Sequence, residues 1–310
     1  MKLLQYLPLI RPLAIKALFK KLDFNGVMQI LDLEDSIQDP FDHKKTFDLK
    51  TNARKNLYWL SEQKLNFKIN NKVFVRINGF ESQHHYNDLK VIKSIILNNN
   101  FKIDGIFLPK TENYKQIIKI QDYFSPLNGN LKLVPIIETK LGFKNLENLL
   151  RDDVENQLIY AVHYGHFDYC LDIESWPFPD PFHYEFWDII DYLADILMRY
   201  NKLYIHTPFP FLKNTLFFWG SEKHLKERYK NLNFYLTSIN LDISLSKKPY
   251  NLEKFKLKKM SRTNKYQKIN ANNIIDIFLK NKTNKRSFAI SEKRFIPPHQ
   301  YYMAKKFLNS

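Results

Sequence analysis

Several residue types that build particular classes of protein are scarce among these 310 residues. The single cysteine, Cys170, excludes an internal disulfide and suits a reducing compartment, so we expect a cytoplasmic protein. Only seven glycines are present, and we find no glycine-rich phosphate-binding loop. No uninterrupted apolar run approaches the length of a membrane span. We interpret the apolar residues 3–10 as a first strand rather than a signal peptide, because Arg11 and Lys16 follow and a small-residue cleavage site does not.

Acidic residues are also under-represented, with 32 against 48 basic ones and a formal net charge of +16. Such a balance can indicate nucleic-acid binding. The lysines are dispersed, however, and no RNA- or DNA-binding motif accompanies them. We therefore favour a solvated basic surface on a chain rich in lysine and asparagine, and we do not expect nucleic acid to be a partner. Attraction of an anionic small substrate fits the same charge. Charge alone does not separate these interpretations.

Short apolar runs recur along the first two-thirds of the chain, at residues 2–7, 27–33, 72–77, 105–109, 131–137, 157–162 and 202–206. Most are apolar at consecutive positions, which is typical of strands buried on both faces of a parallel sheet. Residues 86–98 and 113–124 have the length and pattern of helices between strands, and residues 233–239 are a candidate eighth strand. The sequence therefore predicts an α/β fold, specifically a (β/α)₈ TIM barrel.

The character of the chain changes after the candidate eighth strand. Residues 244–268 are rich in lysine and poor in large aliphatic residues, while residues 272–281 and 297–308 have the pattern of helices. We expect a catalytic barrel over residues 1–243. Residues 244–310 would then form a basic loop plus C-terminal helices, serving as a lid or an oligomer arm.

Nearly every apolar run ends in polar residues. These are Asp32, Glu34 and Asp35, then Arg76 and Asn78, Lys110, Glu138 and Thr139, His166 and Asp168, and finally His206. The C-terminal ends of all strands in a (β/α)₈ barrel meet at one face, where active sites lie. We therefore expect these residues to converge.

Glu138 and Asp168 are the candidate metal ligands. Two carboxylates with open coordination positions suit Mg²⁺ or Mn²⁺, which keep waters that a substrate can displace. The alternative is that each carboxylate caps a helix or pairs with a lysine. The histidines of residues 163–168 match no specific zinc pattern, and we interpret Cys170 as a core residue.

Arg76, at the end of a β-branched strand, could grip a substrate carboxylate through two parallel hydrogen bonds. Alternatively it forms an ion pair with the acids of residues 32–35, and both interpretations can hold together. Lys110 raises Schiff-base chemistry as a rival mechanism. Nearby acids would keep its amine protonated, so we favour a salt bridge.

Five blocks occur in an order that resembles a known family. They are ILDLEDSI (residues 30–37), VFVRING (73–79), DGIFLPKTE (104–112), LVPIIETKLGF (133–143) and YGHFDY (164–169). Together they resemble the citrate lyase β-subunit branch of the HpcH/HpaI aldolase family over roughly residues 5–170. Residues 295–307 (FIPPHQYYMAKKF) also resemble the final helix of the family.

The resemblance implies a Mg²⁺-dependent (or Mn²⁺-dependent) carbon–carbon lyase in a homo-oligomeric barrel, a trimer or hexamer. Its substrates would be hydroxy acids or hydroxyacyl-CoA thioesters of the citryl- or malyl-CoA type. It implies metal binding by Glu138 and Asp168 and anchoring of the substrate carboxylate by Arg76, with the acids of residues 32–35 lining the site in support. We further assign substrate binding to Lys110 and catalysis to Arg76 with Asp32, Glu34 and Asp35.

The sequence also departs from the family pattern. The segment after Asp168 is rich in aromatic residues and proline, and the late Gly-Lys and His-Pro block of the family is missing from residues 205–245. CoA binding therefore carries over less well than metal binding. Two alternatives stay open: a barrel of the phosphoenolpyruvate/pyruvate class acting on a keto acid without CoA, and a non-catalytic protein that binds through its basic surface.

Overall fold

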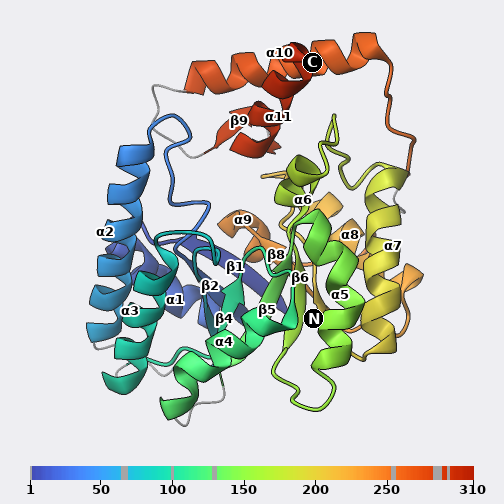
Figure 1. Ribbon diagram of the computed structural model, residues 1–310. Helices are drawn as coiled ribbons and strands as arrows, with labels where there is room; N and C mark the ends of the chain where they lie inside the picture. Colours follow the sequence, from blue (N-terminus) through green and yellow to red (C-terminus); the bar gives the residue numbers. More distant parts are fainter. Residues whose placement is uncertain are drawn as a thin grey trace.

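The computed structural model describes residues 2–63, 69–98, 101–127, 131–252, 256–281, 288–291 and 294–310. Eight parallel strands close into a barrel in sequence order, with β1 paired to β8 (Figure 1). The strands are β1 (Leu3–Pro8), β2 (Val27–Asp32), β3 (Val73–Arg76), β4 (Gly105–Leu108), β5 (Lys132–Ile137), β6 (Ala161–Tyr164), β7 (Leu203–Ile205) and β8 (Phe234–Ser238). The predicted (β/α)₈ fold is confirmed.

Helices follow the strands and surround the barrel (Figure 1). They are α1 (Pro12–Phe24), α2 (His43–Glu62), α3 (His85–Asn98), α4 (Tyr114–Phe124) with the short η1 (Ser125–Leu127), α5 (Lys140–Asp152), α6 (His166–Asp172), α7 (Tyr184–Arg199), α8 (Thr215–Arg228) and α9 (Leu241–Ser244). Capping residues in the sequence fix the N-termini of some of these helices: Asn113 and Gln116 form a capping box on α4, and Thr139 caps α5. Among the described helices, none has the length and apolar character needed to cross a bilayer.

Two apolar layers hold the barrel together. Side chains that point inward fill its centre, among them Tyr6, Ile30, Phe74, Phe107 and Ile136. Side chains that point outward from the same strands pack against the helices and form the larger cluster. This alternation follows from the two-residue period of a strand, and it decides which residues at the strand ends face the barrel axis.

One predicted strand begins later than its apolar pattern suggests. The run at residues 157–162 was predicted to be strand throughout, but β6 begins at Ala161. The amides of Leu158 and Ile159 donate instead to the carboxylate of Asp153, and Gln157 has a positive φ of 48°. Ile159 is buried and forms only an isolated parallel bridge with Leu133, so an apolar run did not by itself identify the start of the strand.

The C-terminal segment, defined here as residues 245–310, lies over the end of the barrel where the strands terminate (Figure 1). It contains α10 (Asn264–Asn281), the hairpin of β9 (Ala289–Ser291) and β10 (Arg294–Ile296), and α11 (Pro298–Asn309). The predicted terminal helices are present, and α10 begins eight positions earlier, at residue 264 rather than 272. Residues 253–255 of the predicted basic loop lie outside the described residues.

Contacts from this segment reach three loops that follow barrel strands. The hydroxyl of Tyr302 donates to the carbonyl of Pro40 at 2.6 Å, after β2. Arg294 pairs with Asp180 at 3.3 Å, after α6, and the amide of Phe295 donates to Pro210 after β7. The mouth of the barrel is therefore bridged by the end of the chain.

Cys170 gives a direct test of this packing. It is fully buried in a cluster that includes Trp176 and, from the C-terminal segment, Ala271 and Met303. Burial raises the pKa of its thiol.

We expect no reaction of Cys170 with Ellman's reagent in the native protein at neutral pH and complete reaction in guanidinium chloride. Trp176→Ala should accelerate native labelling by at least about tenfold by loosening the cluster. Rapid labelling of the native wild type would contradict the packing.

Candidate functional site

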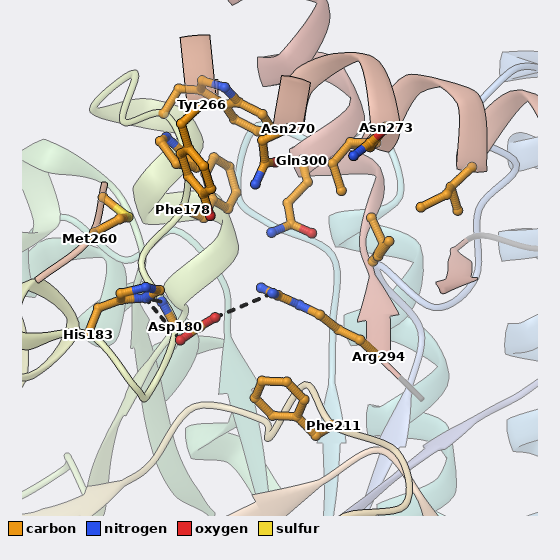
Figure 2. A pocket seen from close by; sticks show the side chains of 15 residues that line it. Phe178, Asp180, His183, Phe211, Met260, Tyr266, Asn270, Asn273, Arg294 and Gln300 are labelled. Atoms are coloured by element: carbon orange, nitrogen blue, oxygen red, sulfur yellow. Dashed lines mark hydrogen bonds and ion pairs between the residues drawn. The ribbon is translucent and has the colours of Figure 1, made fainter. Parts of the chain in front are cut away.

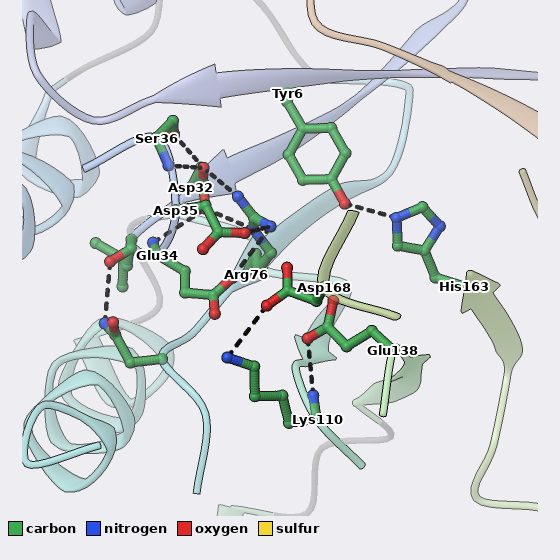
Figure 3. Close-up of polar contacts among 12 residues, drawn as sticks. Tyr6, Asp32, Glu34, Asp35, Ser36, Arg76, Lys110, Glu138, His163 and Asp168 are labelled. Atoms are coloured by element: carbon green, nitrogen blue, oxygen red, sulfur yellow. Dashed lines mark hydrogen bonds and ion pairs between the residues drawn. The ribbon is translucent and has the colours of Figure 1, made fainter. Parts of the chain in front are cut away.

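Most of the predicted polar residues meet at the C-terminal mouth of the barrel (Figure 3), namely Asp32, Glu34, Asp35, Arg76, Lys110, Glu138 and Asp168. Asn78 does not join them, since its side-chain amide donates to Asp88 and to the carbonyl of Leu33. Asp32 and Arg76 are the last residues of β2 and β3, and Glu138 directly follows β5. Each continues the inward-facing series of its own strand, after Ile30, Phe74 and Ile136. The strand period therefore turns these three side chains toward the barrel axis.

Arg76 is the centre of a buried ion-pair network. Its Nε and Nη2 donate to the two carboxylate oxygens of Asp32 at 2.7 and 2.6 Å, which is bidentate pairing. Its Nη1 lies 3.0 Å from both Glu34 and Asp35. The pairing of Asp32 with Arg76 in the parallel ladder of β2 and β3 places the two side chains together.

The network changes the acidity of its members in opposite directions. Burial alone would raise the pKa of Asp32, but Arg76 holds it below its ordinary value. Burial, together with the charge of Asp35, raises the pKa of Glu34 to about 8. The guanidinium carbon of Arg76 lies 4.8 Å from the ring centroid of Tyr6, and the hydroxyl of Tyr6 lies 3.0 Å from Nε2 of His163.

Glu138 and Asp168 lie beside each other across the site from this network (Figure 3). Glu138 accepts a hydrogen bond from the amide of Lys110 at 2.9 Å. Lys110 has a positive φ of 52°, an uncommon backbone conformation that aims its amide at this carboxylate. Burial, reinforced by the charge of Asp168, raises the pKa of Glu138 well above its ordinary value.

Asp168 is held between two basic side chains. Lys110 Nζ lies 3.2 Å from its Oδ1, and Nε2 of His299 lies 3.0 Å from its Oδ2. Although burial opposes ionisation, His299 and Lys110 hold the pKa of Asp168 below its ordinary value. In return, Asp168 raises the pKa of Lys110. An amine held protonated in this way does not suit Schiff-base chemistry, and the predicted salt bridge is the contact that the structure has.

Acids outnumber bases in this site, which we call the acidic cluster. Five carboxyl groups, those of Asp32, Glu34, Asp35, Glu138 and Asp168, meet three basic groups, those of Arg76, Lys110 and His299. With all eight groups ionised, five negative and three positive charges leave two negative charges uncompensated. Burial raises the pKa values of Glu34 and Glu138 most, and the charges of the neighbouring carboxylates Asp35 and Asp168 add to the rise.

Some predicted polar residues take other roles. His163 and His166 are buried, and each has both ring nitrogens in contact with groups outside the acidic cluster: Tyr6 and the Ile205 carbonyl for His163, Tyr164 and the Pro179 carbonyl for His166. Thr139 caps α5. His206 is buried, with its Nδ1 3.0 Å from the hydroxyl of Tyr204. The sequence reasoning missed His299 and Tyr6. His299 lies within the block at residues 295–307 that resembles the family, which was the one available signal.

A separate cavity of about 330 Å³ lies between the C-terminal segment and the loop that follows α6 (Figure 2). Aromatic side chains such as Trp176 and Tyr266 line it, and the Asp180–Arg294 ion pair lies at its floor. None of the acidic-cluster residues lines this cavity. This cavity is therefore separate from the place where the ionisable groups gather.

The sequence matches the HpcH/HpaI aldolase/citrate lyase family over residues 5–180, more than half of the chain. The chain belongs to this family. The predicted resemblance is confirmed, and membership supports a lyase-type activity. No curated protein sequence matches this chain.

Solved structures of low sequence identity share the fold. The citrate lyase β subunit of Mycobacterium tuberculosis, in complex with oxaloacetate and magnesium, is 15% identical with a TM-score of 0.55, covering 76% of this chain and 90% of its own. CitE of the same organism, with magnesium, acetoacetate and coenzyme A, is 13% identical with a TM-score of 0.59, covering 99% and 96%. The pyruvate/acetyl-CoA complex of Haloferax volcanii malate synthase is 11% identical with a TM-score of 0.69, covering 99% and 89%.

Gly165 tests how tightly the site is built. A methyl group on Gly165 would lie 2.2 Å from Oε2 and 2.6 Å from Cβ of Glu138. Gly165→Ala should therefore displace Glu138 and lower the free energy of unfolding by about 1–3 kcal/mol. Gly79→Ala is the matched control, because its methyl group would meet nothing closer than 3.8 Å. Urea unfolding measures both, and equal stabilities of the two variants would contradict the close approach.

Proposed function

We propose that this chain is a divalent-metal-dependent carbon–carbon lyase or aldolase acting on a hydroxy acid or its CoA thioester, of the citryl- or malyl-CoA type. The observation that carries the proposal is the acidic cluster at the mouth of the barrel. It combines adjacent carboxylates of Glu138 and Asp168 with an arginine and a lysine. Membership of an aldolase and lyase family supports the same reaction class.

The donor set fits a hard divalent cation. Carboxylate oxygens are the ligands that Mg²⁺ and Mn²⁺ prefer, and Glu138 and Asp168 are the residues that we propose as ligands. A cation with two positive charges would balance the two uncompensated negative charges of the cluster. The pKa values of Glu34 and Glu138 are raised first by burial and then by neighbouring carboxylates, and they also favour this assignment, because a cation beside these groups would stabilise their ionised forms.

The basic groups suit an anionic substrate. All three nitrogens of Arg76 already contact the acids of residues 32–35, so the arginine is oriented rigidly and has limited capacity left for a ligand. Lys110 is freer, since its side chain is 51% exposed. We propose that Lys110 moves from Asp168 to the substrate carboxylate when a cation occupies the site, and that Arg76 shares that carboxylate.

The residues would divide the work of carbon–carbon cleavage. A bound metal ion supplies Lewis acidity at the substrate oxygens. Arg76 and Lys110 would hold the oxo-acid fragment by its negative charge, while Asp32 keeps the guanidinium in a single orientation. Acetoacetate, oxaloacetate and pyruvate are bound by the related proteins of known structure, some together with coenzyme A or acetyl-CoA. We propose a short oxo-acid as one product or co-substrate here.

The test is a substrate panel combined with two ligand variants. The wild type should cleave or form at least one hydroxy acid or hydroxyacyl-CoA thioester in the presence of Mg²⁺ or Mn²⁺, and EDTA should abolish turnover. Glu138→Gln and Asp168→Asn should each weaken metal binding by at least about 100-fold while leaving the fold intact. Isothermal titration calorimetry measures the binding.

Glu155→Gln is the control, because Glu155 is an exposed acid outside the cluster. It should bind metal and turn over like the wild type. Full metal-dependent activity in Glu138→Gln or Asp168→Asn would refute the assignment. Activity on free acids alone would favour a keto-acid enzyme that works without CoA.

Metal binding should release protons. With its pKa raised to about 8, Glu34 is largely protonated at pH 7 in the absence of a cation, and Glu138 is shifted in the same direction. A cation favours the ionised forms, so its dissociation constant should fall as the pH rises from about 6 to 8. The fall should reach up to about tenfold per pH unit for each proton released. Binding heats should therefore vary with the ionisation enthalpy of the buffer. Buffer-independent heats would contradict the assignment of these pKa shifts.

A further inference from the structure

The C-terminal helix places one imidazole in the acidic cluster. His299 lies in the first turn of α11, and its side chain is 12% exposed. The ring lies near-parallel to that of Phe167, with centroids 6.5 Å apart, and its Nε2 lies 3.0 Å from Oδ2 of Asp168. A residue near the end of the chain thus contacts a proposed metal ligand on α6.

We propose that His299 is a nitrogen ligand of the same metal site, delivered by α11. The inference rests on the proposed function and extends it to the identity of the metal. Asp35, Asp168 and His299 form a group whose ligand atoms all lie within 4.8 Å of one another. The 3.0 Å between His299 Nε2 and Asp168 Oδ2 also matches the spacing of about 3.0 Å between neighbouring ligands about 2.1 Å from an octahedral cation.

His299 differs from the other histidines near the site in its freedom to bind a cation. Both ring nitrogens of His163 and of His166 contact other groups. The Nδ1 of His299 is buried without a hydrogen-bond partner among the described residues, and its Nε2 contacts Asp168, which is itself a proposed metal ligand. The competing explanation is that His299 only forms an ion pair with Asp168 and fastens α11 to the barrel.

Two consequences follow from an imidazole ligand. Nitrogen ligands favour Mn²⁺, Fe²⁺, Co²⁺ or Zn²⁺ over Mg²⁺, so this chain should prefer Mn²⁺ to Mg²⁺. The ligand also lies on a segment that bridges the barrel mouth through Tyr302 and Arg294. Metal binding would therefore fasten the C-terminal segment over the site.

The test is pulsed electron paramagnetic resonance of Mn²⁺ bound to the full chain, which detects a directly coordinated nitrogen. The wild type should give electron spin echo modulations from ¹⁴N. When the histidines of the unmutated protein are labelled with ¹⁵N, modulations from ¹⁵N should appear in their place. His299→Gln should lose them, since it keeps a hydrogen-bonding side chain beside Asp168 but has no imidazole. His43→Gln, at an exposed histidine on α2, is the matched control and should keep them.

Affinities give the second readout. His299→Gln should weaken Mn²⁺ binding by at least about tenfold and Mg²⁺ binding by less than about threefold. Bound Mn²⁺ without nitrogen modulations in the wild type, or modulations that persist in His299→Gln, would overturn the inference and leave the proposed function standing. Absence of saturable Mn²⁺ and Mg²⁺ binding by the wild type would instead overturn the proposed function, and this inference with it.

Discussion

Arg76 and the three acids that surround it set the electrostatic conditions for the whole barrel mouth. Carboxylates as close as Asp32, Glu34 and Asp35 repel one another, and burial makes that repulsion costly. The guanidinium lowers the pKa of Asp32 despite the burial of this carboxyl group, whereas burial and the charge of Asp35 raise the pKa of Glu34. The site is therefore held together by a cation that is part of the chain, and ionisation of all its carboxyl groups would leave an excess of negative charge.

That excess extends across the mouth to Glu138 and Asp168. Lys110 and His299 occupy both oxygens of Asp168, whereas Glu138 accepts only the amide of Lys110 among the contacts described. Lys110 and His299 thus neutralise Asp168 at a position where a bound metal ion would otherwise do so. A cation or an anion that binds here would change which of these ion pairs is favourable, so the partners of Lys110 and His299 would depend on the bound ligand.

The C-terminal segment connects this chemistry to the architecture. Its contacts with Pro40, Asp180 and Pro210 lie on loops that follow three different strands. The segment thereby buries Cys170 on one side and places His299 in the cluster on the other. The separate cavity beside α10 shows that the C-terminal segment does not pack closely against the barrel along its whole length.

Sequence alone determined the barrel and most of the cluster, because both depend on local periodicity. Apolar runs at regular intervals specify buried parallel strands, and the two-residue period carries Asp32, Arg76 and Glu138 to the inner side of the mouth. The prediction for the start of β6 is wrong because Leu158, Ile159 and Tyr160, which precede the strand, are as apolar as strand residues. Only the tertiary structure decided the partners of each charge, since the same arginine could face a substrate or its neighbours. It alone placed His299 beside Asp168, because the docking of a helix from the end of the chain depends on packing between distant segments rather than on any local pattern.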